Sequence, residues 1–291
     1  MSAIQNCLAQ GMFRHCKTTA RLMRNAKEVA LKTQPPTTAL AAVTANMSTG
    51  VTMNDDVVDP LQLEAIFERK RSLRSKIRKD LKNMDPIQRS REDNLIQDIV
   101  LKSSWFKASK SLCAYISCAA LREVDTSRIV SEILSNQTKE GNTQIRKKLY
   151  VPRVDDKHSN MRMLKISSVH NLVASSMNIL EPALVDSDGN QCEDVLQASE
   201  PVDLLLVPGI AFDRSGRRLG RSGGYYDVFI KKYQKLIQER KWKQPLLVAL
   251  SYSLQIVEEP IPVSPHDVPV DALVSPCGFI PISPVALERC D

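Results

Sequence analysis

The segment Val207–Asp227, VPGIAFDRSGRRLGRSGGYYD, gathers residues that are otherwise spread thinly along the chain. The 291 residues include only ten glycines, and five of them lie between Gly209 and Gly224, interleaved with four arginines. An ordinary surface loop needs about one or two glycines at positive φ. Five glycines among alternating positive charges indicate a backbone that lies close against an anionic group.

The flanking residues place this segment between a strand and a helix. Asp203–Val207 (DLLLV) is the strongest strand prediction in the chain, and Tyr225–Gln238 has the pattern of a helix. A loop that enters a helix offers unpaired backbone N–H groups and the positive end of the helix dipole, and glycines let a phosphate approach them. The arginines add charge-assisted donors, and Asp227, about one turn into the helix, could hold Mg²⁺ that bridges phosphate oxygens.

The segment therefore predicts a site for a nucleotide triphosphate or another phosphoester. The plainer alternative is a solvated hairpin whose arginines face water. Two common nucleotide motifs are absent, because there is no GxxxxGK[ST] sequence and the glycines do not have the GxGxxG spacing.

The rest of the body alternates short apolar runs with helical patterns, which is typical of a mostly parallel α/β sheet with helices on both faces. Strands are expected at Ser111–Ser117, Lys148–Val151, Met161–Ile166, Asp203–Val207, Pro245–Leu250 and Asp271–Val274. Met161–Ile166 is expected at an edge, and Pro152 is expected to end the strand before it. Helices are expected over 61–84 with Asp59 as N-cap, from Asp85-Pro86, from Asp125-Thr126 and over Tyr225–Gln238. Ligands of such sheets bind at the carboxyl ends of the strands, where the glycine-rich segment begins.

The N-terminal segment accounts for most of the positive charge. The chain has a formal net charge of +7, and residues 1–50 hold six basic residues against one acidic residue. Residues 1–45 are rich in Ser, Thr and Ala and lack the apolar core of a secretory signal, which predicts a mitochondrial transit peptide and a location in the matrix. Residues 46–59 are predicted to be a linker, and residues 60–291 the folded domain. The weak charge of this body gives no indication of a nucleic-acid or membrane partner, and we expect a monomer.

The glycine-rich segment resembles the signature of 5-formyltetrahydrofolate cyclo-ligases, approximately PGxxFDxxGxRLGxGxGYYD. The matching residues are Pro208, Gly209, Phe212, Asp213, Gly216, Arg218, Leu219, Gly220, Gly224, Tyr225, Tyr226 and Asp227. Further segments match the family in order: KRSLR at Lys70–Arg74, EVDT at Glu123–Thr126, VPR at Val151–Arg153, MRM at 161–163, ILEP at Ile179–Pro182 and VDALV at Val270–Val274. Ser222-Gly223 stands where some relatives carry a glycine-lysine pair, so no lysine of this segment is assigned to a phosphate.

The resemblance implies a fold, a reaction and a set of site residues. The fold would be a three-layer sandwich with a mostly parallel central sheet, of the NagB, ribose-phosphate isomerase and CoA-transferase-like type. The reaction would convert 5-formyltetrahydrofolate and ATP to 5,10-methenyltetrahydrofolate, ADP and phosphate, with Mg²⁺. The implied ATP-binding residues are Lys70, Arg74, Arg218, Leu219, Gly220, Arg221, Ser222, Gly223, Gly224, Tyr225 and Tyr226, of which Arg218, Arg221 and Tyr226 would also be catalytic. The implied folate-binding residues are Glu123, Arg153, Tyr225 and Tyr226, and the implied metal ligands are Asp227 and Asp271.

Plainer interpretations of these residues stay open. The basic run that holds Lys70 and Arg74 has the composition of a solvated helix face, Glu123 could cap the next helix, and Asp271 could be a turn carboxylate. Two other functions also stay open: a sugar-phosphate isomerase or CoA-transferase-like enzyme on the same fold, and an RNA-binding module that uses the basic helix 68–82.

Deleting residues 1–45 from a fusion with a fluorescent protein should abolish import into mitochondria, because the deletion removes the positively charged amphipathic segment. Fluorescence microscopy with a mitochondrial marker measures the location. The full-length fusion is the control, and import of the shortened fusion would contradict the prediction.

Overall fold

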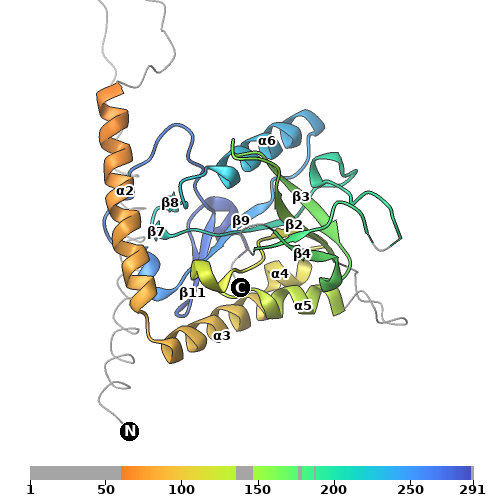
Figure 1. Cartoon of the computed structure of the whole chain (residues 1–291), viewed down its shortest axis with the longest axis horizontal. Helices are drawn as coiled ribbons and strands as arrows, with labels where there is room; N and C mark the ends of the chain where they lie inside the picture. The colour runs from red at the N-terminus through yellow and green to blue at the C-terminus, as the bar shows by residue number, and fades with distance from the viewer. Residues whose placement is uncertain (1–59, 136–146, 176–178, 187, 290–291) are drawn as a thin grey trace, which may run out of the picture. The chain divides into compact units, whose positions relative to one another are not determined.

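The computed structural model describes residues 60–135, 147–175, 179–186 and 188–289 (Figure 1). The predicted transit peptide, the linker and the N-cap Asp59 lie outside the described residues. No helix in the described part of the chain is both long and apolar enough to span a membrane.

A seven-stranded sheet forms the centre of the fold, in the order β12-β11-β9-β6-β1-β2-β3. Its strands are β1 (Ser111–Ala114), β2 (Lys148–Val154), β3 (Met161–Ile166), β6 (Leu204–Val207), β9 (Leu246–Leu250), β11 (Ala272–Ser275) and β12 (Gly278–Pro281). The five inner strands are parallel, and β3 and β12 pair with them antiparallel at the two edges. The predicted α/β fold with a mostly parallel sheet is therefore confirmed, and so is the edge position of Met161–Ile166.

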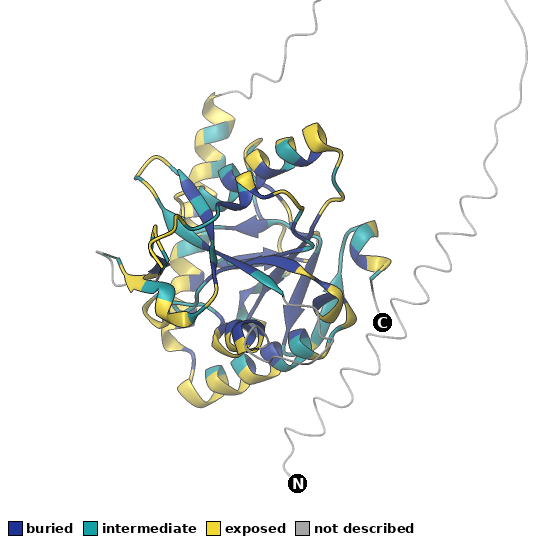
Figure 2. Cartoon of the chain, turned by 90° about the vertical axis from the view of Figure 1, so that its right-hand side faces the viewer, coloured by how far each residue is buried: buried dark blue, intermediate teal, exposed yellow. Residues whose placement is uncertain are grey.

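The inner strands are continuous apolar runs because helices cover the sheet on both sides. Successive residues of β6 alternate between two hydrophobic clusters: Leu204 and Leu206 belong to one, and Leu205 and Val207 to the other. The first cluster includes side chains of α3 (Pro86–Lys102), α4 (Ser104–Ala108) and α5 (Ser127–Ser135). The second includes side chains of α6 (Tyr225–Arg240). Figure 2 shows the buried residues concentrated in the sheet and on the helix faces toward it.

The first helix of the described chain, α2 (Pro60–Asn83), confirms the helix predicted over 61–84. Most of its surface is exposed, and its buried residues are Lys70, Ile77 and Leu81. It lies beside the glycine-rich segment (Figure 1), where Arg74 Nε donates to the carbonyl oxygen of Gly220 at 2.8 Å. The helix is therefore held by side-chain donors to this segment as well as by apolar packing.

Inside the predicted loop the chain forms a small hairpin, which the sequence indicated only as the plainer alternative to a phosphate site. Strands β7 (Ala211–Asp213) and β8 (Arg218–Leu219) pair antiparallel, and β10 (Ile256–Val257) joins them in a three-stranded sheet. The other short elements are β4 (Leu172–Ala174), β5 (Leu180–Pro182) and α7 (Pro284–Leu287). The hairpin gives the arginine at position 218 a fixed backbone, which a simple loop would not provide.

The prediction that Pro152 ends its strand is wrong. Strand β2 continues to Val154, and Pro152 pairs with Met163 of β3. The pairing of β2 with β1 ends at Tyr150, so β2 has no strand partner on that side at Pro152. The missing N–H of Pro152 therefore breaks no hydrogen bond to β1. The extension carries Pro152 and Val154 toward the carboxyl end of the sheet, where they become part of a cavity wall.

The order of the strands fixes where a ligand can enter. Strand β2 pairs with one edge of β1, and β6, which comes later in the chain, pairs with the opposite edge of β1. A crevice opens outside the carboxyl ends of the strands at such a reversal of strand order. In this fold the reversal lies between β1 and β6, and β6 leads directly into the glycine-rich segment.

Candidate active site

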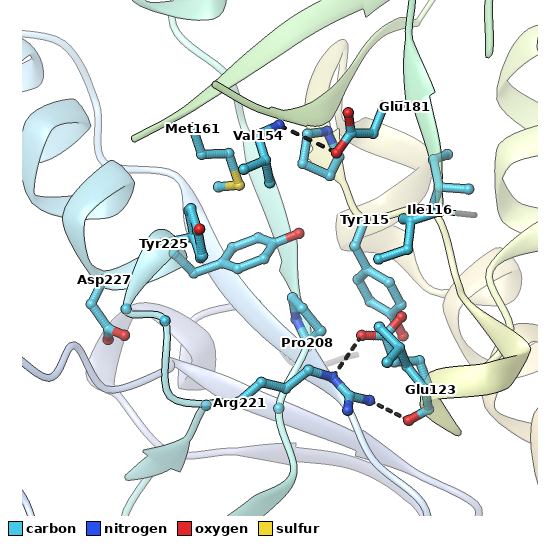
Figure 3. Close-up of a pocket in the computed structure, with 18 of the residues that line it drawn as sticks. Tyr115, Ile116, Glu123, Val154, Met161, Glu181, Pro208, Arg221, Tyr225 and Asp227 are labelled. Carbon is cyan, nitrogen blue, oxygen red and sulfur yellow. Dashed lines mark hydrogen bonds and ion pairs between the residues drawn. The ribbon is translucent and has the colours of Figure 1, made fainter. Parts of the chain in front are cut away.

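A cavity of about 330 Å³ lies at the carboxyl ends of β1, β2 and β6 (Figure 3). Tyr115 and Ile116 follow β1, Val154 ends β2, and Pro208 follows β6, so each of the three strands contributes to its walls. The lining is mostly apolar, with a few charged side chains among aliphatic and aromatic ones. An apolar cavity with a small number of oriented polar groups is typical of a site for an organic ligand.

The glycines of the segment allow the chain to pack against its own aromatic rings. A Cβ on Gly223 would lie 2.5 Å from the ring of Tyr225, and a Cβ on Gly209 would lie 2.5 Å from the ring of Phe212. Ser222 adopts a φ of 105°, which is unfavourable for a residue with a Cβ. The segment is therefore held in its shape before any ligand is considered.

Arg218 lies at the centre of this arrangement, and its side chain is 3% exposed. It donates to the carbonyl oxygen of Pro208 at 3.3 Å and to Oδ1 of Asp227 at 2.7 Å. Its Nε is buried and is the one buried side-chain nitrogen or oxygen in the described residues that has no hydrogen-bond partner. A buried donor without an acceptor is costly, so this nitrogen indicates that an acceptor comes from a ligand.

Asp227 also bonds to the loop that carries a second carboxylate, Asp267, which the sequence did not single out. Its Oδ1 also accepts from the backbone N–H of Val268 at 3.0 Å. The preceding residue, Asp267, forms an ion pair with Lys70 of α2, whose side chain is 4% exposed. Burial alone would raise the pKa of Asp267, but the hydrogen bonds from Lys70 and Ser264 hold it below its usual value. Asp227 is thus bonded to the residue that follows Asp267 in the chain.

Glu123 and Arg221 form a second ion pair, at the rim of the cavity (Figure 3). Arg221 Nε lies 3.2 Å from Glu123 Oε1, and Oε2 accepts from the N–H of Cys118 at 3.0 Å. Arg221 also donates to the carbonyl oxygen of Leu121. Burial raises the pKa of Glu123, and Arg221 opposes that shift. The pair therefore holds the loop after β1 against the glycine-rich segment.

The two tyrosines at the start of α6 both line the cavity. The Tyr225 hydroxyl donates to the carbonyl oxygen of Asp156 at 2.9 Å, which fixes the ring. Burial raises the pKa of Tyr226 well above its usual value, and the nearby Glu123 adds to the shift. The Tyr226 phenol therefore stays protonated at neutral pH.

Most residues that the sequence assigns to the site meet at the cavity. They are Glu123, Arg218, Gly220, Arg221, Gly223, Gly224, Tyr225, Tyr226 and Asp227. Leu219 and Ser222 belong to the same stretch of chain but are not among the residues that line the cavity; Leu219 is buried. Arg74 contacts the same segment through the carbonyl oxygen of Gly220, and Lys70 pairs with Asp267 of the loop before β11. The role of these two residues in binding a nucleotide stays a prediction.

Two assigned residues lie elsewhere. Asp271 precedes β11, and its Oδ2 accepts from the N–H of Leu247 at 2.8 Å near the start of β9. Because β9 and β11 are parallel, Asp271 lies at the opposite end of the sheet from the cavity, which separates it from Asp227. Arg153 donates to the carbonyl oxygen of Pro182 at 2.7 Å and does not line the cavity.

No three His, Cys, Asp or Glu side chains in the described part of the chain cluster to hold a metal ion. Mg²⁺ is usually held by one or two carboxylates, with phosphate oxygens and waters completing its shell. Asp227 lines the cavity and accepts from the N–H of Val268, the residue after Asp267, whereas Asp271 accepts from Leu247 near the start of β9.

The fold and the site define an α/β enzyme with a mostly apolar cavity beside a glycine- and arginine-rich segment. The sequence profile of the 5-formyltetrahydrofolate cyclo-ligase family matches residues 66–276. The chain therefore belongs to the 5-formyltetrahydrofolate cyclo-ligase family.

Similar proteins from distant organisms agree with this membership. The mitochondrial 5-formyltetrahydrofolate cyclo-ligase of Arabidopsis thaliana is 61% identical over 228 residues, which cover 78% of this chain and 81% of that protein. The 5-formyltetrahydrofolate cyclo-ligase of Mus musculus is 30% identical over 208 residues, covering 70% of this chain and 92% of that protein. The NMR structure of the Aquifex aeolicus 5,10-methenyltetrahydrofolate synthetase superposes with a TM-score of 0.56 at 27% identity, covering 73% of this chain and 92% of that one.

Replacing Arg221 by Met should lower the free energy of unfolding by about 2 kcal/mol at neutral pH, because the buried Glu123 carboxylate loses its partner. The pKa of Glu123 is raised in the folded state, so the ionised form costs stability as pH rises through that pKa. The deficit of the variant should therefore be larger at about pH 8 than at about pH 4. Urea unfolding at both pH values measures it.

The double variant Arg221→Met, Glu123→Gln is the control, because it removes the charge as well as its partner. It should recover part of the lost stability and flatten the pH dependence. Equal losses at both pH values, with no recovery in the double variant, would contradict the assignment of this ion pair.

Proposed function

We propose that this chain converts 5-formyltetrahydrofolate and ATP to 5,10-methenyltetrahydrofolate, ADP and phosphate. Its membership in the cyclo-ligase family supports the reaction. The observation that carries the proposal within the structure is the buried, unpartnered Nε of Arg218 in the wall of an apolar cavity. Such a site suits an organic substrate that meets a phosphoryl group.

The chemistry explains why ATP is consumed. The N5-formyl group is an amide, and its oxygen is a poor leaving group. Transfer of the γ-phosphoryl group to that oxygen turns it into a phosphate that can leave. N10 then attacks the formyl carbon and loses its proton, and the carbon–oxygen bond breaks to release phosphate as the ring closes. Phosphoryl transfer of this kind depends on positioning and charge neutralisation more than on a protein nucleophile.

We place the triphosphate along the glycine-rich segment. The residues assigned to it are Lys70, Arg74, Arg218, Leu219, Gly220, Arg221, Ser222, Gly223, Gly224, Tyr225 and Tyr226. Lys70 and Arg74 lie on the α2 side of this segment, and the cavity lies on its other side. Arg218 would donate its free Nε to the transferring group while its terminal nitrogens stay bonded to Asp227 and Pro208.

We place the folate in the cavity. Its apolar walls suit the faces of the pterin, the Glu123 carboxylate suits an N–H edge of that ring, and Tyr225 and Tyr226 would flank it. Arg153 has a different role in this scheme, because its guanidinium holds the carbonyl oxygen of Pro182.

For Mg²⁺ we propose Asp227 and Asp267 as the protein ligands, in place of the pair Asp227 and Asp271. Asp267 adjoins Val268, whose N–H bonds to Asp227, whereas Asp271 bonds to Leu247 at the far end of the sheet. When bound, the cation would neutralise charge on the phosphate oxygens.

We propose the mitochondrial matrix as the location, from the composition of residues 1–45 and from the mitochondrial relative of Arabidopsis thaliana. We also propose that the sheet is the central layer of a three-layer sandwich of the sugar-phosphate isomerase and CoA-transferase type. An isomerase or transferase on that fold would not consume ATP, so the assay below separates it from a cyclo-ligase.

The full chain, incubated with 5-formyltetrahydrofolate, ATP and Mg²⁺, should produce the methenyl chromophore, which absorbance follows directly. Arg218→Ala and Asp227→Asn should each reduce kcat by about 100-fold or more, because both remove charge stabilisation from the transition state. Arg214→Ala is the matched control, since Arg214 belongs to the same segment but is 55% exposed and pairs with Glu258. No product from the unaltered chain would reject the function, and near-parental rates in both variants would reject the assigned phosphate site.

Titration with Mg²⁺ in the same assay tests the metal ligands. Asp267→Asn should raise the Mg²⁺ concentration needed for half-maximal rate by about tenfold, because a charged oxygen ligand is lost. Asp271→Asn should leave that concentration unchanged, since the amide oxygen can still accept from Leu247. The opposite result for the two variants would return the metal site to Asp271.

A further inference from the structure

Glu181 is a buried carboxylate in the cavity wall that the reaction scheme above does not use. It lies on β5, its residue is 8% exposed, and it lines the cavity. Leu180 beside it is 46% exposed. An acidic side chain turned inward next to a leucine turned outward inverts the usual pattern of a strand with one buried face. The ILEP sequence at Ile179–Pro182 therefore has a feature that packing does not explain.

The Glu181 carboxylate has little compensation within the protein. Its Oε1 accepts from the N–H of Val154 at 3.5 Å, which is the limit of a hydrogen bond. Among the described residues this is its one hydrogen bond, and none of the ion pairs between them includes it. A buried carboxylate without a cation or strong donors is costly, so its position indicates donors that arrive with a ligand.

Glu123 provides the contrast on the same cavity. Figure 3 shows Glu181 on one wall, and Glu123 with Arg221 across the space between Tyr115 and Tyr225. Glu123 has a guanidinium and a backbone N–H as partners, so its charge is largely balanced. Of the two glutamates on these walls, Glu181 is the one that keeps most of its hydrogen-bonding capacity for a ligand.

The backbone that carries Glu181 is held firmly. Arg153 Nη1 donates to the carbonyl oxygen of Pro182 at 2.7 Å, and β5 pairs antiparallel with β4. Arg153 follows Pro152 on the extended end of β2, whose neighbour Val154 is the donor to Glu181. This arrangement gives Arg153 a positioning role toward Glu181, through the strand rather than through the ligand.

We propose that Glu181 is a further substrate-binding residue, which accepts a hydrogen bond from an N–H group of the reduced pterin on the wall opposite Glu123. The inference rests on the proposed function. A tetrahydropterin carries N–H donors on more than one edge, so two carboxylates on opposite walls can be satisfied by one ring. The apolar residues between them contact the faces of that ring. Glu181 thereby selects for a donor-rich heterocycle over an apolar ring of the same size.

The test measures binding of 5-formyltetrahydrofolate and of ATP separately, by calorimetry on the full chain. Glu181→Gln should weaken the folate affinity by about tenfold or more, the scale of a lost charge-assisted hydrogen bond. Its affinity for ATP should not change. Glu259→Gln is the matched control, because it makes the same chemical change on the surface, away from the cavity.

Thermal unfolding of the ligand-free chain shows whether Glu181 has a structural role, because loss of a structural residue would lower the Tm. Glu181→Gln should keep or raise the Tm, because it removes a poorly compensated buried charge. Glu181→Leu, which fills the same space without a polar group, should behave likewise in stability and bind folate more weakly still.

Three outcomes would overturn the inference. Unchanged folate affinity in Glu181→Gln and Glu181→Leu would reject it while leaving the proposed function intact. A fall in Tm with equal losses of folate and ATP binding would assign Glu181 a structural role instead. Failure of the unaltered chain to bind 5-formyltetrahydrofolate at all would reject both the inference and the proposed function.

Discussion

The buried ion pair between Arg218 and Asp227 is the constraint on which the site depends. Arg218 comes from the β7–β8 hairpin and Asp227 from the first turn of α6, and the pair is completed by the carbonyl oxygen of Pro208 and the N–H of Val268. The Arg218 side chain is 3% exposed and that of Asp227 16%, so loss of either partner would leave a largely buried charge without compensation. The four segments must therefore meet in one geometry. The same geometry leaves the Nε of Arg218 without a partner. The same ion pair therefore holds the four segments together and leaves a donor of Arg218 free for the proposed anionic ligand.

The glycine-rich segment divides the site into two chemical environments. On its α2 side lie cationic groups, including Lys70 and Arg74, held by Asp267 and by the Gly220 carbonyl oxygen. On its other side lies a mostly apolar cavity that is lined by two glutamates, Glu123 and Glu181. A reaction that joins a polyanion to a neutral, donor-bearing heterocycle needs such a division. One set of charges could not favour both ligands in the same place.

Particular residues show how far sequence patterns reach. The inner strands β6, β9 and β11 were predictable because a strand buried on both faces is a continuous apolar run. The strands of the β7–β8 hairpin were not, since strands of two or three residues have no period to detect. The end of β2 was predicted wrongly at Pro152. A proline is tolerated there because β1 no longer pairs with β2 beyond Tyr150, which the sequence does not show. The helix at 61–84 followed from its spacing, but its contact with Gly220 did not.

The chain order of the residues settled the α/β class, the position of the glycine-rich segment after the best strand, and the resemblance to one enzyme family. Each of these features depends on residues that are close together in the chain, so sequence patterns are enough to predict it. The choice between Asp267 and Asp271, the pairing of Arg221 with Glu123, and the inward position of Glu181 came only from the folded chain. Each of them depends on which distant segments the sheet order brings side by side. Asp267 and Asp271 are four residues apart in the chain, yet one pairs with Lys70 of α2 and the other bonds to Leu247 of β9.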